Sequence, residues 1–169
     1  MLRNALFLTF ILSLLAGVGW HPAYAGSREE AEIRALIDRW TEAAQEKNVD
    51  GVMAIYQRGP SLVAYDLVPP LQYKGWDAYR ADYETFFGQY DGPIKFELRD
   101  LAIAADETLG YSHELQRVSG TLKGGHKAEF WLRVTQVYRK TDGQWRVVHE
   151  HVSVPTNLET GKAALDLTP

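Results

Sequence analysis

Apolar residues recur every three or four positions in the first half of this chain, which is typical of helices. The first helix is predicted over residues 27–47 and starts at a capping box formed by Ser27 and Glu30. Its buried stripe consists of Ile33, Leu36, Ile37, Trp40 and Ala44. A short second helix is predicted before Gly59–Pro60, and a third runs from Trp76 to a stop at Gly88.

From Pro93 onward the apolar residues alternate with polar ones, which is typical of β-strands. Long strands are predicted at about residues 94–104, 109–122, 127–140 and 145–154, and a short strand is predicted at 61–66. Gly124–Gly125 and Asp142–Gly143 supply hairpin turns. We therefore expect an α+β fold, in which three N-terminal helices pack on the concave face of a curved antiparallel sheet and enclose a cone-shaped pocket.

The first 25 residues have the features of a secretory signal peptide. Arg3 gives a positive start, residues 5–20 are almost wholly apolar, and Ala23–Tyr24–Ala25 fits the small-x-small cleavage rule. The apolar run is shorter than the roughly 20 residues that span a bilayer. We expect cleavage near Ala25, export to the periplasm or the medium, one domain over residues 26–155 and a weakly patterned tail over 156–169.

Composition and missing motifs narrow the classes of function. The net charge of −4 argues against nucleic acids and anionic membranes as partners. The chain has no cysteine, so an exported form must be stable without disulfides. It also lacks a phosphate-binding loop, a dinucleotide fingerprint and a nucleophile elbow. We therefore expect no cofactor.

Three segments resemble those of a known family: "NVDGVMAIY", "YDLVPPLQYKGWDAY" and "WRVVHEHVSVP". In these segments and in the order of its elements, the chain resembles the SnoaL-like proteins of the nuclear transport factor two-like superfamily, which includes ketosteroid isomerases. The resemblance covers nearly all of residues 28–155. It implies a cystatin-like roll, a small and mostly apolar pocket, and homodimers formed through the outer face of the sheet.

Strand alternation places Trp145, His149 and His151 on one face of the last strand. Trp131 and Arg133 share a face of the preceding strand. The resemblance implies that both of these faces look into the pocket. It also places Asp66 near the pocket mouth, with His113, Tyr65 and Trp40 as further candidates for ligand contact.

Three interpretations of these polar residues remain open. In the first, His149 and His151 hold a metal ion, but the sequence places no third ligand and we predict no metal site. In the second, Asp66 is a general base assisted by His149 or His151. The resemblance to ketosteroid isomerases puts Trp40 at the position of the donor tyrosine, where only its indole N–H can donate. In the third, these groups form a satisfied buried network.

Two functions follow from these interpretations. In the first, an exported protein binds a small apolar carbonyl or carboxylate compound, oriented by Arg133, and carries out cofactor-free acid–base chemistry of the isomerase or cyclase type. In the second, the chain is a non-catalytic dimeric module for binding or protein interaction. The expected partners are a small apolar molecule and a second copy of the chain, without nucleic acid or membrane.

Overall fold

The computed structural model describes residues 27–169, so the predicted signal peptide over residues 1–25 lies outside the described residues. Three helices come first: α1 (Arg28–Gln45), α2 (Val49–Met53) and α3 (Trp76–Gly88). The capping box of α1 is confirmed, because the Ser27 hydroxyl accepts a hydrogen bond from the Glu30 N–H at 3.1 Å. The Glu30 carboxylate accepts the reciprocal bond from the Ser27 N–H at 3.0 Å. Each predicted helix is present, with α2 the shortest.

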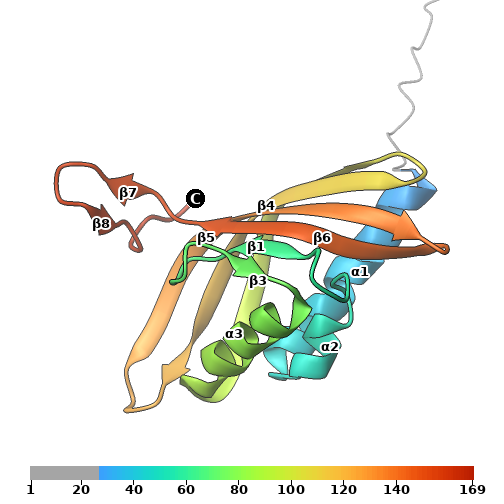
Figure 1. Ribbon diagram of the computed structural model, residues 1–169. Helices are drawn as coiled ribbons and strands as arrows, with labels where there is room; N and C mark the ends of the chain where they lie inside the picture. The colour runs from blue at the N-terminus through green and yellow to red at the C-terminus, as the bar shows by residue number, and fades with distance from the viewer. Residues whose placement is uncertain (1–26) are drawn as a thin grey trace, which may run out of the picture.

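Six strands form one curved sheet in the order β2-β1-β6-β5-β4-β3 (Figure 1). Their bounds are β1 (Val63–Tyr65), β2 (Tyr73–Lys74), β3 (Tyr90–Ala105), β4 (Leu109–Leu122), β5 (Lys127–Thr141) and β6 (Gln144–Ser153). Strand β1 runs parallel to β6, and the other neighbouring pairs are antiparallel. The four predicted long strands are confirmed, and β2 is an addition that the sequence did not predict.

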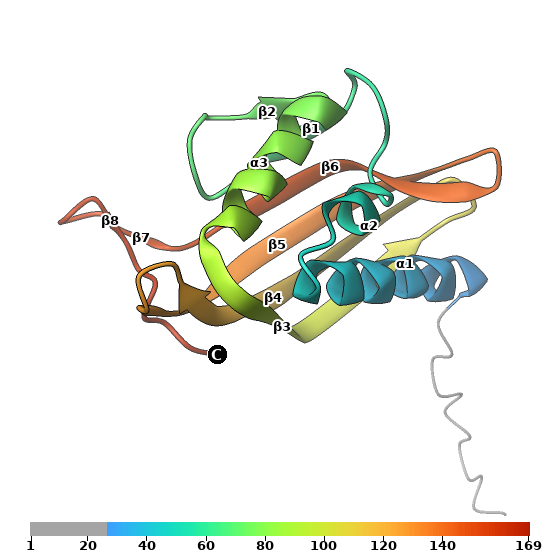
Figure 2. The ribbon, with the colours of Figure 1, turned by 90° about the horizontal axis from the view of Figure 1, so that it is seen from below.

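The three helices lie on one face of the sheet, as Figure 2 shows from below. The apolar stripe of α1 is buried there, and Trp40 packs edge-on against Phe96 of β3 with ring centroids 5.3 Å apart. The indole N–H of Trp76, at the start of α3, donates to the Met53 carbonyl at 3.0 Å and ties α3 to α2. Burial of these aromatic side chains supplies much of the driving force for this packing.

Strand β6 contains a bulge that changes which side chains face the helices. Tyr138 of β5 pairs with Val147, but its neighbour Val137 pairs with His149. Val148 is therefore an extra residue that has no partner on β5. An extra residue reverses the alternation beyond it. Trp145 and Val147 are therefore buried before the bulge, and the buried residues after it are Glu150 and Val152.

The tail after residue 155 forms a hairpin of β7 (Thr156–Asn157) and β8 (Lys162–Ala163), which projects beside the sheet (Figure 1). Its strand residues are exposed, which agrees with the weak hydrophobic pattern of this segment. Within residues 27–169, no helix is long and apolar enough to cross a membrane.

Candidate functional site

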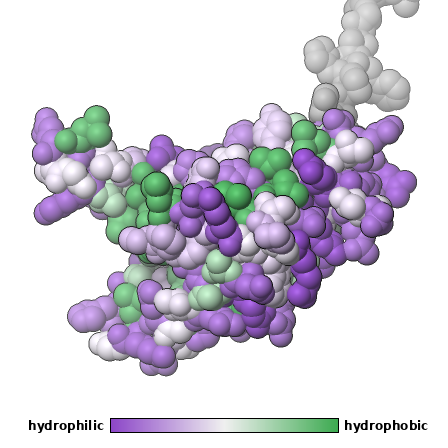
Figure 3. Space-filling view, viewed as in Figure 1, coloured by the Kyte–Doolittle hydropathy of each residue, from purple (hydrophilic) through white to green (hydrophobic). Residues whose placement is uncertain are grey.

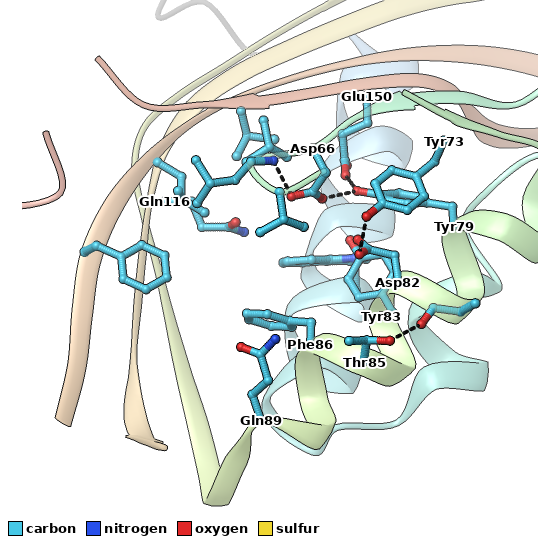
Figure 4. A pocket seen from close by; sticks show the side chains of 18 of the residues that line it. Asp66, Tyr73, Tyr79, Asp82, Tyr83, Thr85, Phe86, Gln89, Gln116 and Glu150 are labelled. Carbon is cyan, nitrogen blue, oxygen red and sulfur yellow. Dashed lines mark hydrogen bonds between the residues drawn. The ribbon is translucent and has the colours of Figure 1, made fainter. Parts of the chain in front are cut away.

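A cavity of about 600 Å³ lies between the helices and the inner face of the sheet. Its wall is mostly apolar and aromatic, with polar groups from the residues after β1, from helix α3, and from strands β2, β4, β5 and β6 (Figure 4). Leu67, Val68 and Pro69 of the loop between β1 and β2 line it as well. Figure 3 shows apolar surface over this loop, at the left of the view. A cavity of this size and character suits a small organic molecule.

The Tyr79 hydroxyl contacts two carboxyl groups at the cavity wall, one buried and one partly buried. It lies 3.1 Å from Asp66 Oδ2 and is also hydrogen-bonded to Glu150 Oε1. In Figure 4 the two carboxyl groups reach this hydroxyl from different elements, Asp66 from the end of β1 and Glu150 from β6. Tyr79 itself comes from α3, so the cluster joins three elements.

Glu150 is the more enclosed of the two acids, with only 2% of its surface exposed. Its Oε2 accepts hydrogen bonds from the Tyr56 hydroxyl at 2.9 Å and from the side-chain amide of Gln136. The Tyr56 hydroxyl is also 2.9 Å from that of Tyr83. Both oxygens of Glu150 are therefore engaged, which holds the carboxyl group in one orientation.

A count of hydrogens indicates that one of the two acids is protonated when the Tyr79 hydroxyl is hydrogen-bonded to both. The Tyr79 hydroxyl has a single hydrogen, so it can donate to Asp66 or to Glu150 but not to both. In the other contact the carboxyl group must itself carry a proton and donate it to the Tyr79 oxygen. Burial raises the pKa of Glu150 to about 7, and burial also raises the pKa of Asp66. One arrangement thus has protonated Glu150 donating to Tyr79, which in turn donates to ionised Asp66.

Two further carboxyl groups line the same cavity. Asp82 accepts a hydrogen bond from the Tyr73 hydroxyl at 2.7 Å, and burial raises its pKa to about 6. Glu114 projects from β4, and burial raises its pKa to about 7. Glu114 Oε2 and the indole nitrogen of Trp40 are buried without a hydrogen-bond partner among residues 27–169. An unpaired buried donor and an unpaired buried acceptor are costly, and a ligand could satisfy both.

Of the residues predicted for the site, the structure places Asp66 and Trp40 in the cavity wall. The other six lie on the outer face of the sheet: Tyr65, His113, Trp131, Arg133, His149 and His151. The expectation that these six side chains face the pocket is therefore wrong. For His149 and His151 the reason is the bulge at Val148. For His113, Trp131 and Arg133 the inner face is taken by their neighbours in β4 and β5.

The outer-face residues make contacts of their own. The Tyr65 ring packs edge-on against His149 and His151, with centroids 4.9 and 5.6 Å away. His149 Nδ1 donates to the Val63 carbonyl at 2.9 Å. Within residues 27–169, no three histidine or acidic side chains are arranged to hold a metal ion. The structure thus brings the histidine pair together with Tyr65, away from Asp66.

Sequence reasoning missed Glu150, Glu114 and Gln136 as cavity residues. Each is polar, and its neighbours on the strand were assigned to the inner face. Because neighbouring strand residues point to opposite faces, these three residues were assigned to the outer face. A signal for β4 and β5 was available in Val118, Leu132 and Val134, which share the parity of the missed residues and are buried. Tyr79 lies within the third predicted helix but was not assigned to the site.

Comparison with known proteins identifies the family. The SnoaL-like domain model matches residues 33–157, which include every residue of the cavity cluster described above. The chain belongs to the SnoaL-like domain family. The resemblance inferred from the sequence is thereby confirmed. No curated protein sequence matches this SnoaL-like chain.

Solved structures support the same assignment. A nuclear transport factor 2-like protein of unknown function from Pseudomonas putida is 39% identical, with a TM-score of 0.75 over 83% of this SnoaL-like chain and 96% of that one. A protein of the same superfamily from Salmonella enterica is 20% identical, with a TM-score of 0.69 over 79% and 96%. A ketosteroid isomerase-like protein from Erwinia carotovora is 18% identical, with a TM-score of 0.64 over 76% and 97%. The last two show the shared fold alone.

Proposed function

We propose that this SnoaL-like protein binds a small, largely apolar carbonyl compound and moves a proton at the carbon beside the carbonyl group, without a cofactor. The observation that carries this proposal is the shared hydroxyl of Tyr79. It contacts the carboxyl groups of both Asp66 and Glu150 at the wall of an apolar cavity. Acids whose pKa values lie near the working pH are suited to general acid–base catalysis.

Asp66 is the proposed base, because it lines the cavity and is ionised when Glu150 holds the shared proton. Its carboxylate takes the proton from the carbon, the C–H electron pair forms a carbon–carbon double bond, and the carbonyl oxygen becomes an enolate. The unpaired indole N–H of Trp40 is the proposed donor to that oxygen. Return of the proton from Asp66 to carbon, at the same or a conjugated position, completes exchange or isomerisation.

A carbonyl compound fits the cavity better than a carboxylate. Arg133, which the sequence suggested for binding a carboxylate, lies on the outer face. Of the cavity-lining residues in the described part of the chain, none is lysine, arginine or histidine. A negatively charged ligand would therefore meet only acidic and neutral side chains, which is unfavourable in a buried site.

The test is hydrogen–deuterium exchange at the carbon beside a carbonyl group. Purified protein is incubated with 2-tetralone or cyclohexanone in D₂O, and loss of the adjacent proton signals is followed by NMR. We expect exchange above the buffer rate, reduced at least about 100-fold in Asp66→Asn, as is typical for loss of a general base. The matched control is Asp38→Asn, an exposed position of α1 outside the cavity. Exchange no faster than in buffer for both ketones contradicts the proposal.

A second proposal concerns the outer face of the sheet, which we propose is covered by a second copy of the chain. Tyr65, Leu109 and Tyr111 are 40%, 48% and 50% exposed, although large apolar side chains are more often buried. Tyr111 also stacks on His113, with ring centroids 6.5 Å apart. Exposed aromatic and apolar side chains of this kind are enriched at protein interfaces.

Export is also part of the proposal. It is supported by the predicted signal peptide alone, and fractionation of expressing cells tests it. We expect the mature chain, beginning at Gly26, outside the cytoplasm. Mass spectrometry of the N-terminus checks the cleavage position, and a cytoplasmic chain that retains residues 1–25 rules out export.

A further inference from the structure

We propose that the cavity recognises an organic cation, a small apolar molecule with a protonated amino group, and that Glu114 receives this group. The inference rests on the proposed function, since it names the class of compound that would enter the same cavity. It rests on three features: an unpaired carboxyl oxygen, a cavity whose described lining has acidic but no basic side chains, and an aromatic wall.

The unpaired carboxyl oxygen belongs to Glu114. This residue stands on the inner face of β4, lines the cavity and is only 6% exposed. Its Oε2 has no hydrogen-bond partner among the described residues 27–169. A buried acceptor without a partner loses the hydrogen bond it would make with water. An ammonium group in the cavity would supply a hydrogen and a compensating charge together.

The charge of the cavity favours a cation. Four carboxyl groups line it, from Asp66, Asp82, Glu114 and Glu150, and its described lining contains no basic side chain. The charge of Arg34 in α1 acts to lower the pKa of Glu114. Arg34 is itself exposed and forms no ion pair with Glu114 in the described part of the chain. The acidic groups are thus left without a counter-charge, which a cationic ligand would provide.

Aromatic rings form much of the remaining wall. Trp40, Tyr83, Phe86 and Tyr90 all line the cavity. Trp40 and Tyr83 are edge-to-face neighbours with centroids 6.5 Å apart, and so are Phe86 and Tyr90 at 5.3 Å. The faces of aromatic rings attract ammonium groups through the ring quadrupole. A cavity that combines such rings with carboxyl groups can hold the apolar and the charged parts of an aryl-alkyl amine.

Binding of a cation should release a proton at neutral pH. Burial, and then the charge of Glu150, raise the pKa of Glu114 to about 7, so the free protein carries Glu114 partly protonated at pH 7. The charge of Glu114 also acts on the Tyr138 hydroxyl of β5, which stays protonated because burial raises its pKa. An ammonium group beside Glu114 stabilises the ionised carboxylate. The proton that this carboxyl group held therefore leaves for the buffer.

The experiment uses three probes that differ in one group: 4-phenylbutylamine, 4-phenylbutanol and 4-phenylbutyrate. Affinities for the mature protein are measured by isothermal titration calorimetry at pH 7, in phosphate and in Tris. We expect the amine to bind at least about tenfold more tightly than the alcohol, because a charge-assisted hydrogen bond is the stronger one. The two buffers should report proton release for the amine and none for the alcohol.

Glu114→Gln should weaken amine binding at least about tenfold and abolish the proton release, with the alcohol unaffected. The matched control Glu107→Gln removes an exposed carboxyl group from the β3–β4 turn and should leave all three affinities unchanged. If amine and alcohol bind equally, or butyrate binds most tightly, the inference is wrong while the cavity keeps its proposed function. If none of the three probes nor 2-tetralone binds, the proposed function fails as well. The affinities of the three probes for the wild-type protein decide between these results even if Glu114→Gln does not fold.

Discussion

Asp66 and Glu150 meet at one phenolic hydroxyl, although one follows the short strand β1 and the other lies within β6. Strand β1 runs parallel to β6, with Ala64 paired to Glu150, so the two acids are close because these strands are neighbours. Tyr79 reaches them from helix α3, which packs on the same face of the sheet. The sheet order therefore brings together the two acids on which the proposed chemistry depends.

Loss of the shared hydroxyl should destabilise the protein and impair proton transfer. In Tyr79→Phe both carboxyl groups lose a buried hydrogen bond, and we expect the free energy of unfolding to fall by about 1–3 kcal/mol. Urea denaturation followed by tryptophan fluorescence measures this change. Tyr111→Phe removes a hydroxyl from an exposed outer-face ring and should leave the stability unchanged. Equal stability of the two variants contradicts the proposed sharing.

The stability of the fold should decrease as pH rises from about 4.5 to 7. Burial raises the pKa of Glu150 from 4.5 in the unfolded chain to about 7 in the fold. The unfolded chain thus releases this proton first, and the stabilisation present below pH 4.5 is lost as pH approaches 7. The loss is on the order of 3 kcal/mol.

Glu150→Gln isolates the contribution of this residue, since glutamine does not titrate. Urea denaturation at pH 5 and pH 7 should show a smaller difference between the two pH values in the variant than in the parent. Glu107→Gln, at an exposed position, should keep the parent's dependence on pH. An unchanged dependence in Glu150→Gln means that Glu150 is already ionised at pH 5.

Trp40→Phe separates the role of the indole N–H from packing. The smaller ring can keep much of the edge-on contact with Phe96, so the stability should fall by less than the roughly 3 kcal/mol typical of deleting a buried aromatic ring. Loss of a hydrogen-bond donor to a developing oxyanion should slow ketone exchange about 100-fold. The NMR exchange assay and urea denaturation are run on the same preparation. Wild-type exchange rates in this variant mean that another group binds the carbonyl oxygen.

A charge on the outer face should weaken the proposed dimer. In Tyr111→Glu we expect the dissociation constant to rise at least about tenfold, since a central interface aromatic typically contributes more than about 1 kcal/mol. Sedimentation velocity over a range of concentrations measures this effect. Leu71→Glu places the same charge in the loop between β1 and β2, at a side chain that is 95% exposed. A monomeric parent protein at all concentrations excludes the dimer.

The fold was predictable because the signals that determine it are local. The capping box at Ser27, the stripe that contains Trp40 and the hairpin turn at Asp142–Gly143 each specify a nearby part of the backbone. Packing of an apolar helix stripe on an alternating sheet then leaves few arrangements. The two-residue strand β2 has no such pattern. It is a strand because it pairs with β1, and its own residues do not indicate one.

The site was predictable only where position did not depend on long-range register. Asp66 ends a short strand beside the proline-bearing loop, and Trp40 lies on a helical stripe, so both reach the cavity as expected. Glu150 was missed because no single residue of "WRVVHEHVSVP" marks Val148 as the extra one. The bulge lies where the partners of β6 change: Val147 bonds to the segment at Ile55 and Gln57, whereas His149 pairs with β1.

Strand β6 carries two sets of ionisable groups, the imidazoles of His149 and His151 and the carboxyl group of Glu150. The bulge decides which of the two faces the cavity. A regular strand of the same length would turn both imidazoles inward and the carboxyl group of Glu150 outward. Backbone geometry at Val148, rather than the choice of residues, thus selects an acidic interior over a basic one. Homologues that gain or lose this irregularity could acquire a different ligand preference without exchanging a single side chain in the strand.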